Sequence, residues 1–253
     1  MKTLIIFAKA PVAGQVKTRL TKNTPLDAAE VCRLYEGFLK DTIISSAMTD
    51  AKNIAIHFTP ADEEPMMKKI VTSLRLGVRN ENRFVFTPQE GKSFTERVEN
   101  AFRAEAAGGS ELVMIGADSP MIRPDVIDEA FEFVYARSGM ALGPSGEGGL
   151  YLIGYPADVS FDYNEVFTHG SELENMTAIA ERLAMPVRLL PGALDVDVEA
   201  DLVTLLGMVR ALDYERRFEG SLFPSHTHKA LKKLELEVVR SSGDTRAKRL
   251  ARL

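Results

Sequence analysis

Short runs of apolar residues alternate with amphipathic segments along most of the chain. The apolar runs are rich in β-branched residues and predict strands, whereas segments whose apolar positions recur every three to four residues predict helices. We expect strands at 3–8, 53–58, 84–86, 111–115, 140–142, 150–153 and 187–190. We expect helices from Pro25 behind a Thr24 cap, at 63–74, at 93–106 before the stop Gly108-Gly109, at 125–136, from the capping box Ser171-x-x-Glu174 to 183, and at 199–212.

This alternation of strands and helices indicates the fold class. It predicts an α/β protein with three layers, α/β/α, around a mostly parallel, Rossmann-like central sheet. A chain of 253 residues fits one such domain. We assign residues 1–212 to it and expect 213–253 to be a C-terminal helical extension with a basic tail, not a separate domain. Ser241–Leu253 has few apolar residues, which predicts a solvated or frayed tail.

Composition and charge narrow the classes of function. The chain has 31 Lys and Arg against 36 Asp and Glu, a net charge of −5, which argues against broad nucleic-acid binding. The single cysteine, Cys32, excludes an intrachain disulfide and fits a reducing compartment. No apolar run approaches the roughly 20 residues of a membrane span. We therefore expect a cytoplasmic protein without nucleic-acid or membrane partners.

The loop after the first predicted strand carries the most informative chemistry. Lys9, Lys17 and Arg19 lie close together with no acidic residue between them, and Pro11 and Gly14 indicate a fixed loop. The loop lies at the carboxyl end of a strand, where open α/β sheets bind ligands. Cations and backbone N–H groups that converge there suit a polyphosphate. A solvated basic turn is the alternative interpretation.

Two common phosphate loops do not fit this spacing. A Walker loop needs a glycine directly before the Lys-Thr pair, but Gln15 and Val16 separate Gly14 from Lys17. A Rossmann fingerprint needs three glycines at fixed spacing, and this loop has one.

Acidic residues follow two of the later strands. Asp118 comes directly after the run that ends in Gly116-Ala117, and a carboxylate facing phosphates needs a cation between them. Mg²⁺ typically takes one or two carboxylates plus phosphate oxygens, although an Asp before Ser-Pro also starts ordinary turns. Asp195 and Asp197 face the same side of an extended segment. We expect Asp197 to be the second metal ligand, or the N-cap of the following helix, or both.

Four groups of residues, in the same order along the chain, resemble a known family. They are Lys9-x-Pro11-x-x-Gly14-x-x-Lys17-Thr-Arg19, Gly116-x-Asp118-x-Pro120, Gly148-Gly149-x-Tyr151-Leu-Ile-Gly154 and Asp195-Val-Asp197. Over roughly residues 1–210 the chain resembles bacterial glycosyltransferase-A-fold proteins of the nucleotide-diphospho-sugar transferase superfamily. It is similar to phospholactate guanylyltransferase and, more distantly, to molybdenum-cofactor guanylyltransferase.

The resemblance implies roles for individual residues. The loop, with Lys9, Ala10, Pro11, Gly14, Lys17 and Arg19, would bind nucleotide phosphates together with Gln89 and Gly91. Lys17, Arg19 and Asp118 would be catalytic, and Asp118 and Asp197 would hold Mg²⁺ or Mn²⁺. We expect Glu147, Gly148, Gly149 and His169 on the acceptor side. The departures from the family pattern, Glu147, Leu150 and Val198-Glu199, fall mostly on that acceptor half.

The implied function is metal-dependent transfer of a glycosyl group from a nucleotide-sugar to a small-molecule acceptor. Nucleotidyl transfer of the guanylyl or cytidylyl kind, with release of pyrophosphate, is the first alternative. A nucleotide-binding protein without catalysis is the second. The residues do not specify the base, the sugar, the acceptor or the oligomeric state.

Overall fold

A computed structural model describes residues 1–108, 111–220, 222–241 and 244–253. The chain divides into two compact units. The first unit comprises Met1–Ala10, Ile43–Ala117 and Ile122–Ala193, and the second comprises Pro11–Thr42, Asp118–Met121 and Leu194–Leu253. Among the described residues, each helix is too short or too polar to span a lipid bilayer.

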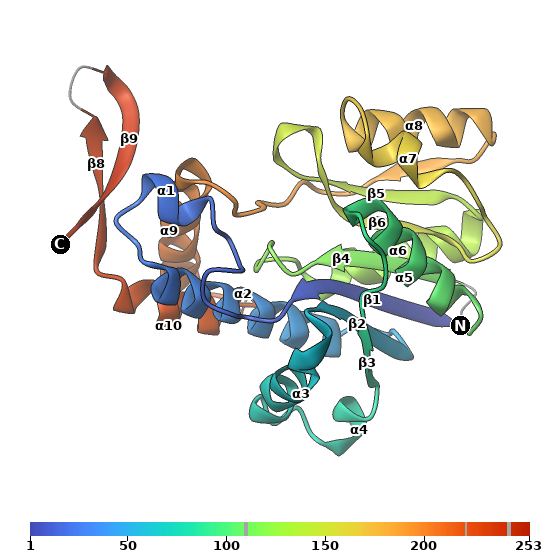
Figure 1. The fold of residues 1–253 in the computed structure, drawn as a ribbon, viewed down its shortest axis with the longest axis horizontal. Helices are drawn as coiled ribbons and strands as arrows, with labels where there is room; N and C mark the ends of the chain where they lie inside the picture. Colours follow the sequence, from blue (N-terminus) through green and yellow to red (C-terminus); the bar gives the residue numbers. More distant parts are fainter. Residues whose placement is uncertain (109–110, 221, 242–243) are drawn as a thin grey trace. The chain divides into compact units, whose positions relative to one another are not determined.

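A seven-stranded sheet forms the centre of the first unit (Figure 1). Its strands stand in the order β3-β2-β1-β4-β6-β5-β7. Strand β6 runs antiparallel to its neighbours β4 and β5, whereas the other pairs are parallel. The mostly parallel sheet of the prediction is therefore confirmed. The bounds are β1 Lys2–Lys9, β2 Asn53–Thr59, β3 Phe84–Pro88, β4 Glu111–Gly116, β5 Met140–Pro144, β6 Leu150–Pro156 and β7 Val187–Leu189.

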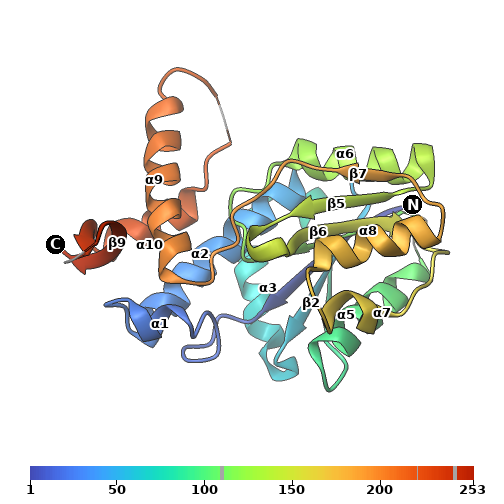
Figure 2. The same cartoon turned by 90° about the horizontal axis from the view of Figure 1, so that it is seen from above.

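Helices cover both faces of this sheet, which gives the three predicted layers (Figure 2). On one face, apolar side chains of α5 (Phe94–Ala106), α7 (Tyr163–Phe167) and α8 (Glu172–Arg182) share a buried core with β1, β4, β5 and β6. On the other face α6 (Pro124–Arg137) packs on β4, β5 and β6. The unit also contains α3 (Glu64–Ser73), α4 (Val78–Glu81) and the 3₁₀ turns Ala61–Glu63 and Gly146–Gly148. The long helix α2 (Ala28–Ala47) begins in the second unit and ends in the first.

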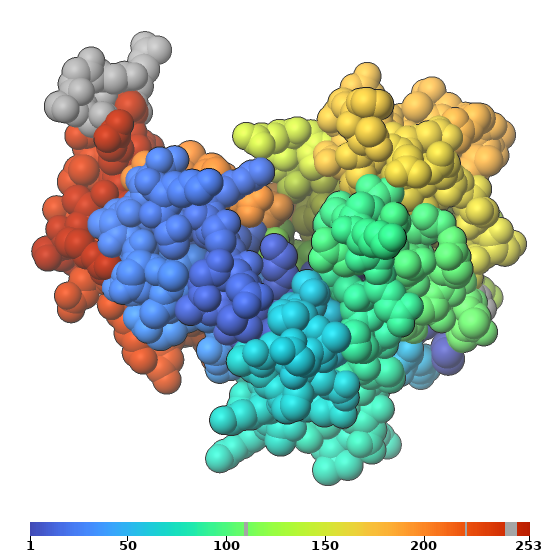
Figure 3. Space-filling view, viewed as in Figure 1, coloured from blue at the N-terminus to red at the C-terminus, as the bar shows by residue number. Residues whose placement is uncertain are grey.

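The second unit joins the N-terminal loop to the C-terminal part of the chain. It contains α1 (Leu20–Asn23), α9 (Glu199–Glu215), α10 (Ser225–Lys233) and the hairpin of β8 (Leu236–Ser241) and β9 (Asp244–Arg252). The buried carboxylate of Asp41 accepts the backbone N–H groups of His226 at 3.1 Å and Thr227 at 2.7 Å, at the first turn of α10. Arg252 pairs with Glu30 of α2 at 2.5 Å, and Figure 3 shows the red C-terminal residues against the blue residues of the α1 and α2 region.

Two local predictions are wrong. Helix α2 begins at Ala28, not at Pro25, because Asp27 and Glu30 form a reciprocal cap: each carboxylate accepts the backbone N–H of the other residue. The stretch predicted as a solvated or frayed tail forms strand β9, whose Leu250 is buried and donates its N–H to Glu199 of α9. Residues 242 and 243 of that stretch, and Gly109 of the predicted glycine stop, lie outside the described residues.

Candidate functional site

The basic loop enters the second unit at Pro11 and folds back on itself before α1. Gln15 donates its N–H to Val12 O at 3.0 Å, and the turn passes through Gly14 at a φ of 80°. Val16 and Leu20 are buried and anchor the loop on either side of Lys17. Lys17 itself has a φ of 45°, a left-handed conformation that costs a non-glycine residue about 1–3 kcal/mol. The fold therefore holds Lys17 in a strained conformation, a feature that clusters at functional sites.

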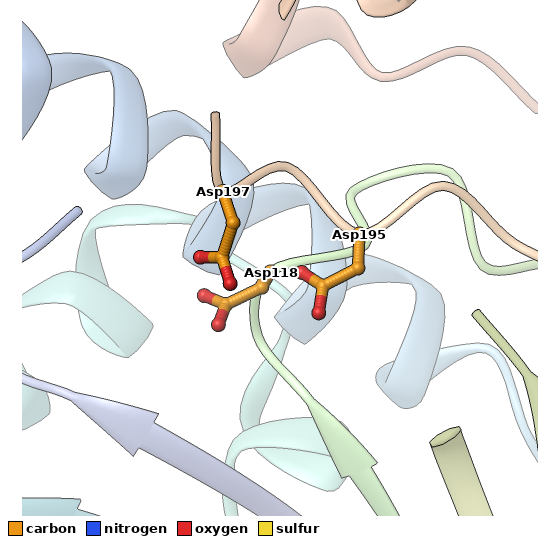
Figure 4. A group of neighbouring side chains, drawn as sticks. All are labelled: Asp118, Asp195 and Asp197. Atoms are coloured by element: carbon orange, nitrogen blue, oxygen red, sulfur yellow. The ribbon is translucent and has the colours of Figure 1, made fainter. Parts of the chain in front are cut away.

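Two segments place three carboxylates in the same unit. Asp118 stands two residues beyond the end of β4, and its carbonyl oxygen accepts the N–H of Val196 at 3.2 Å. Val196 is fully buried, so its neighbours Asp195 and Asp197 point away from the core on the opposite side. Figure 4 shows the three carboxylates turned towards one another. One oxygen from each lies within 4.8 Å of the others.

The ammonium group of Lys17 lies among these carboxylates. Its Nζ is 2.6 Å from Asp197 Oδ1, 2.9 Å from Asp118 Oδ2 and 3.6 Å from Asp195 Oδ1. Arg19 Nη1 is 3.8 Å from Asp197 Oδ2, and its side chain is 66% exposed. The lysine side chain, in contrast, is only 5% exposed. Lys17 is thus the buried cation of the group, and Arg19 stands at its rim.

The carboxylates and the lysine shift one another's protonation. Burial alone would lower the pKa of Lys17, but the attraction of Asp118, Asp195 and Asp197 outweighs burial and raises that pKa. Burial raises the pKa of Asp195 to about 6; Lys17 opposes this increase and the neighbouring carboxylates add to it. Lys17 therefore stays an ammonium ion at neutral pH, whereas the carboxyl group of Asp195 takes up a proton near pH 6.

The residues of this group suit a hard divalent cation. Three carboxylates and one ammonium leave a net charge of −2, and oxygen ligands are those that Mg²⁺ and Mn²⁺ prefer. Asp195 Oδ1 is buried and accepts no hydrogen bond within the described part of the chain. An unsatisfied buried oxygen beside two further carboxylates is a natural ligand position. The group therefore fits the metal expected from the sequence.

The structure changes the roles expected within the Asp195–Asp197 pair. Helix α9 has Val198 as its N-cap, and the Asp201 carboxylate accepts the N–H groups of Asp197 and Val198 at 2.9 Å each. The expectation that Asp197 caps this helix is wrong, and its carboxylate lies with Lys17 instead. Asp195 belongs to the same group of carboxylates but was not among the expected ligands. The alternation of the segment, which puts both carboxylates on one side, was the signal for including it.

Other predicted phosphate-binding residues belong to the first unit, where structural contacts occupy them. Ala10 is buried and donates its N–H to Thr59 O, while Lys9 is exposed at the end of β1. The Gln89 side-chain amide donates to the carbonyl oxygens of Ala8 and His57 at 2.9 Å each, which ties the ends of β1 and β2 together. Phosphate binding by these residues stays a prediction.

Gly91 of the same predicted set has a reason of its own to be glycine. Its φ is 134°, and a Cβ there would lie 2.9 Å from the backbone nitrogen of Arg97 in α5. The close approach to the helix thus accounts for the missing side chain.

The predicted acceptor-side residues meet in the first unit. Ser171 Oγ donates to Gly148 O at 2.8 Å and joins the turn with Glu147, Gly148 and Gly149 to the start of α8. His169 is exposed two residues before Ser171, and Glu147 is exposed with a φ of 57°. A Cβ on Gly148, whose φ is 79°, would lie 2.5 Å from Ser171 Oγ. The fold therefore brings these four residues near one another, while their part in acceptor binding stays a prediction.

Comparisons with known proteins place the chain among related folds. The model of the family described as "Uncharacterized protein conserved in bacteria (DUF2064)" matches residues 43–169. No curated protein matches the sequence significantly. A candidate nucleotide-diphospho-sugar transferase from Desulfovibrio desulfuricans G20 is similar in structure, with a TM-score of 0.74 and 24% identity over 92% of this chain and 95% of that one.

Two further solved structures resemble the chain more distantly. A 4-diphosphocytidyl-2C-methyl-D-erythritol synthase from Anaerococcus prevotii DSM 20548 has a TM-score of 0.55 and 7% identity, over 83% of this chain and 96% of that one. CMP:2-keto-3-deoxy-manno-octonic acid synthetase, complexed with CTP, has a TM-score of 0.50 and 12% identity, over 85% of this chain and 100% of that one. At these identities the likeness concerns the fold, which agrees with the superfamily expected from the motifs.

Proposed function

Since this chain belongs to the DUF2064 family, we propose that it is a metal-dependent transferase that acts on a nucleotide-diphospho-sugar. The observation that carries the proposal is the group formed by Lys17, Asp118, Asp195 and Asp197. Cations and carboxylates meet here at a loop whose motif resembles a nucleotide phosphate loop. The likeness in fold to a candidate nucleotide-diphospho-sugar transferase supports the same substrate class.

The carboxylates and the cations of the group would have different roles in the reaction. Asp118, Asp195 and Asp197 would hold the divalent cation, and Lys17 and Arg19 would neutralise phosphate charge. The bound ion would supply a Lewis acid that stabilises negative charge on the diphosphate. In glycosyl transfer an acceptor oxygen bonds to the anomeric carbon while the bond from that carbon to the diphosphate breaks. The nucleoside diphosphate leaves, and the proton of the acceptor hydroxyl passes to a base.

Nucleotidyl transfer is the second candidate function. It is favoured by the likeness in fold to the 4-diphosphocytidyl-2C-methyl-D-erythritol synthase and to the CMP:2-keto-3-deoxy-manno-octonic acid synthetase, which was solved with CTP. In that reaction an acceptor oxygen bonds to the α-phosphorus of a nucleoside triphosphate, and pyrophosphate leaves.

Product analysis separates these functions. The protein is incubated with Mg²⁺ or Mn²⁺, with nucleotide-sugars or nucleoside triphosphates, and with small-molecule extract as acceptor. Release of nucleoside diphosphate supports glycosyl transfer, and release of pyrophosphate supports nucleotidyl transfer. Nucleotide binding without either product would leave a binding protein and contradict the proposed transferase.

The Asp118→Asn variant tests the role of the metal group. We expect turnover to fall about 100-fold or more, as for removal of a group that stabilises transition-state charge. The metal-dependent thermal stabilisation by nucleotide, about 2.7 kcal/mol at 100 times Kd in the wild type, should be lost as well. Asp62→Asn, at an exposed position in the first unit, is the matched control and should behave as the wild type. Unchanged metal-dependent stabilisation in Asp118→Asn would remove Asp118 from the site.

A further inference from the structure

The buried ammonium of Lys17 lies where a divalent cation would be expected. It contacts oxygens of Asp118 and Asp197 at hydrogen-bond distance and lies 3.6 Å from the buried Asp195 Oδ1. The Lys17 side chain is 5% exposed, so water solvates its ammonium group very little. The lysine is therefore the principal counter-charge of the three carboxylates.

The lysine and a divalent ion compete for the same oxygens. Mg²⁺ binds carboxylate oxygens at about 2.1 Å, and Nζ lies 2.6 and 2.9 Å from two of them. The ion and Nζ would then contact the same two oxygens, Asp197 Oδ1 and Asp118 Oδ2. Even on opposite sides of these oxygens, the two cations would lie at most about 4 Å apart. Two cations at that distance repel each other strongly in a partly buried site. The ammonium group and the divalent ion therefore cannot bind these carboxylate oxygens at the same time without one of them moving.

We propose, on the basis of the proposed metal site, that Lys17 is a tethered cation that occupies the carboxylate group until Mg²⁺ or Mn²⁺ enters. Entry of the ion displaces the ammonium, which then becomes available to the phosphates of the nucleotide. Metal binding and phosphate binding are therefore coupled through one side chain, and each favours the other. Without metal, the carboxylates retain the cation that the phosphates need.

The loop is built to permit this exchange. Lys17 has a φ of 45°, which is a strained conformation for a non-glycine residue. A change to an ordinary backbone conformation would release this strain. Ala13, Gly14 and Gln15 before it are exposed, and a Cβ on Gly14 would lie more than 4 Å from every atom in the described part of the chain that it could meet. Within the described ranges, side chains at these positions make no buried contacts that a movement of the loop would have to break. On this proposal the Lys17 side chain moves while the buried side chains of Val16 and Leu20 keep the loop in place.

Binding of Mn²⁺ alone tests the proposal without substrate. The concentration of free Mn²⁺ is followed by electron paramagnetic resonance for the wild type, Lys17→Gln and Lys17→Met. We expect both variants to bind Mn²⁺ about tenfold more tightly or better, because a competing unit charge within about 4 Å is gone. Lys22→Gln removes an exposed lysine from α1 and should leave the affinity unchanged. Asp118→Asn should bind more weakly and thereby identifies the site.

The possible outcomes separate this inference from the proposed function. Equal or weaker Mn²⁺ binding by folded Lys17 variants would overturn the exchange while leaving the metal site in place. Absence of Mn²⁺ binding in the wild type and all variants would overturn the exchange together with the proposed metal site. Tighter binding by the Lys17 variants supports both.

Chemical labelling of the wild type gives a second readout that needs no substitution. An acylating reagent is applied with and without Mg²⁺, and the modification of each lysine is measured by mass spectrometry. We expect Mg²⁺ to increase the labelling of Lys17, which leaves its buried position, while Lys22 serves as the internal reference. Once the binding measurement has shown that the ion binds, unchanged or reduced labelling of Lys17 would show that the lysine does not move, and would overturn the proposal.

Discussion

Replacing Gly91 by alanine tests whether this glycine is required by packing. Gly91 has a φ of 134° in the turn before α5. An added Cβ would lie 2.8 Å from Glu96 Cβ, 2.9 Å from the backbone nitrogen of Arg97 and 3.0 Å from the carbonyl carbon of Glu96. Two of these three atoms belong to the backbone of the helix and cannot rotate aside. The turn or the first turn of α5 must therefore shift.

The magnitude follows from two terms. A side chain at this φ costs about 1–3 kcal/mol in backbone strain, and forcing one extra carbon into a packed contact costs about 1–3 kcal/mol. Since a shift of the turn relieves part of both, we expect the free energy of unfolding to fall by about 2–4 kcal/mol.

The control is Gly108→Ala beyond the other end of α5. A Cβ on Gly108 would meet no atom of the described residues within 4 Å, and the φ of Gly108 lies outside the left-handed range, so the change should stay within about 0.5 kcal/mol. Urea unfolding followed by circular dichroism gives both free energies, with equal m-values expected. If Gly91→Ala is as stable as Gly108→Ala, the steric reasoning is refuted. If it is that stable and also loses nucleotide binding, Gly91 serves the ligand instead.

Two further predictions concern charge. Arg240 and Lys248 stand opposite each other in the β8–β9 hairpin and are both exposed. Lys248→Glu should therefore replace a repulsive pair of charges by an attractive one and raise the free energy of unfolding by about 0.5–1 kcal/mol, measured by urea unfolding at low salt. A destabilised variant would contradict the pairing of these two residues. Because the pKa of Asp195 is about 6 without metal and its carboxyl group must lose its proton to bind an ion, the affinity for Mn²⁺ should rise with pH and be about tenfold weaker at pH 5 than at pH 7.5. Titrations that give the same affinity at both pH values would exclude Asp195 as a ligand.

Much of the first unit could be predicted from local patterns. The buried runs at 3–8 and 111–115 mark β1 and β4 to within one residue at each end, because strands covered on both faces contain little besides apolar residues. The antiparallel direction of β6 could not be predicted in this way. The alternation of side chains between the two faces of a sheet is the same whichever way a strand runs. Only the pairing of β6 with β4 and β5 determines its direction.

The errors occur where a local signal competes with a contact. Thr24 has the residue type of a helix cap, but its hydroxyl donates to Leu20 O and closes α1, which leaves the capping of α2 to Asp27. The segment of β9 is rich in cations and was expected to be solvated. It is held by Leu250 against α9 and by Arg252 on Glu30, contacts that span about 50 and 220 residues of sequence.

The sequence predicted the kinds of charged groups in the candidate site better than it predicted which residues contact one another there. The loop with Lys17 and Arg19 and the carboxylates of Asp118 and Asp197 could be singled out because each follows a strand-like run. The sequence could not show that Lys17 reaches all three carboxylates, since that depends on the backbone hydrogen bond between Val196 and Asp118.

The only cysteine of the chain lies at the base of the basic loop. Cys32 Sγ donates to the carbonyl oxygen of Pro11 at 2.9 Å, and burial raises the pKa of its thiol. A thiol reagent therefore has a single target in the wild-type protein, and its rate of reaction depends on how often this hydrogen bond opens. The thiol on α2 is thus a natural reporter of the loop that contacts it, so kinetics of modification with and without ligands can follow loop movement without an engineered label.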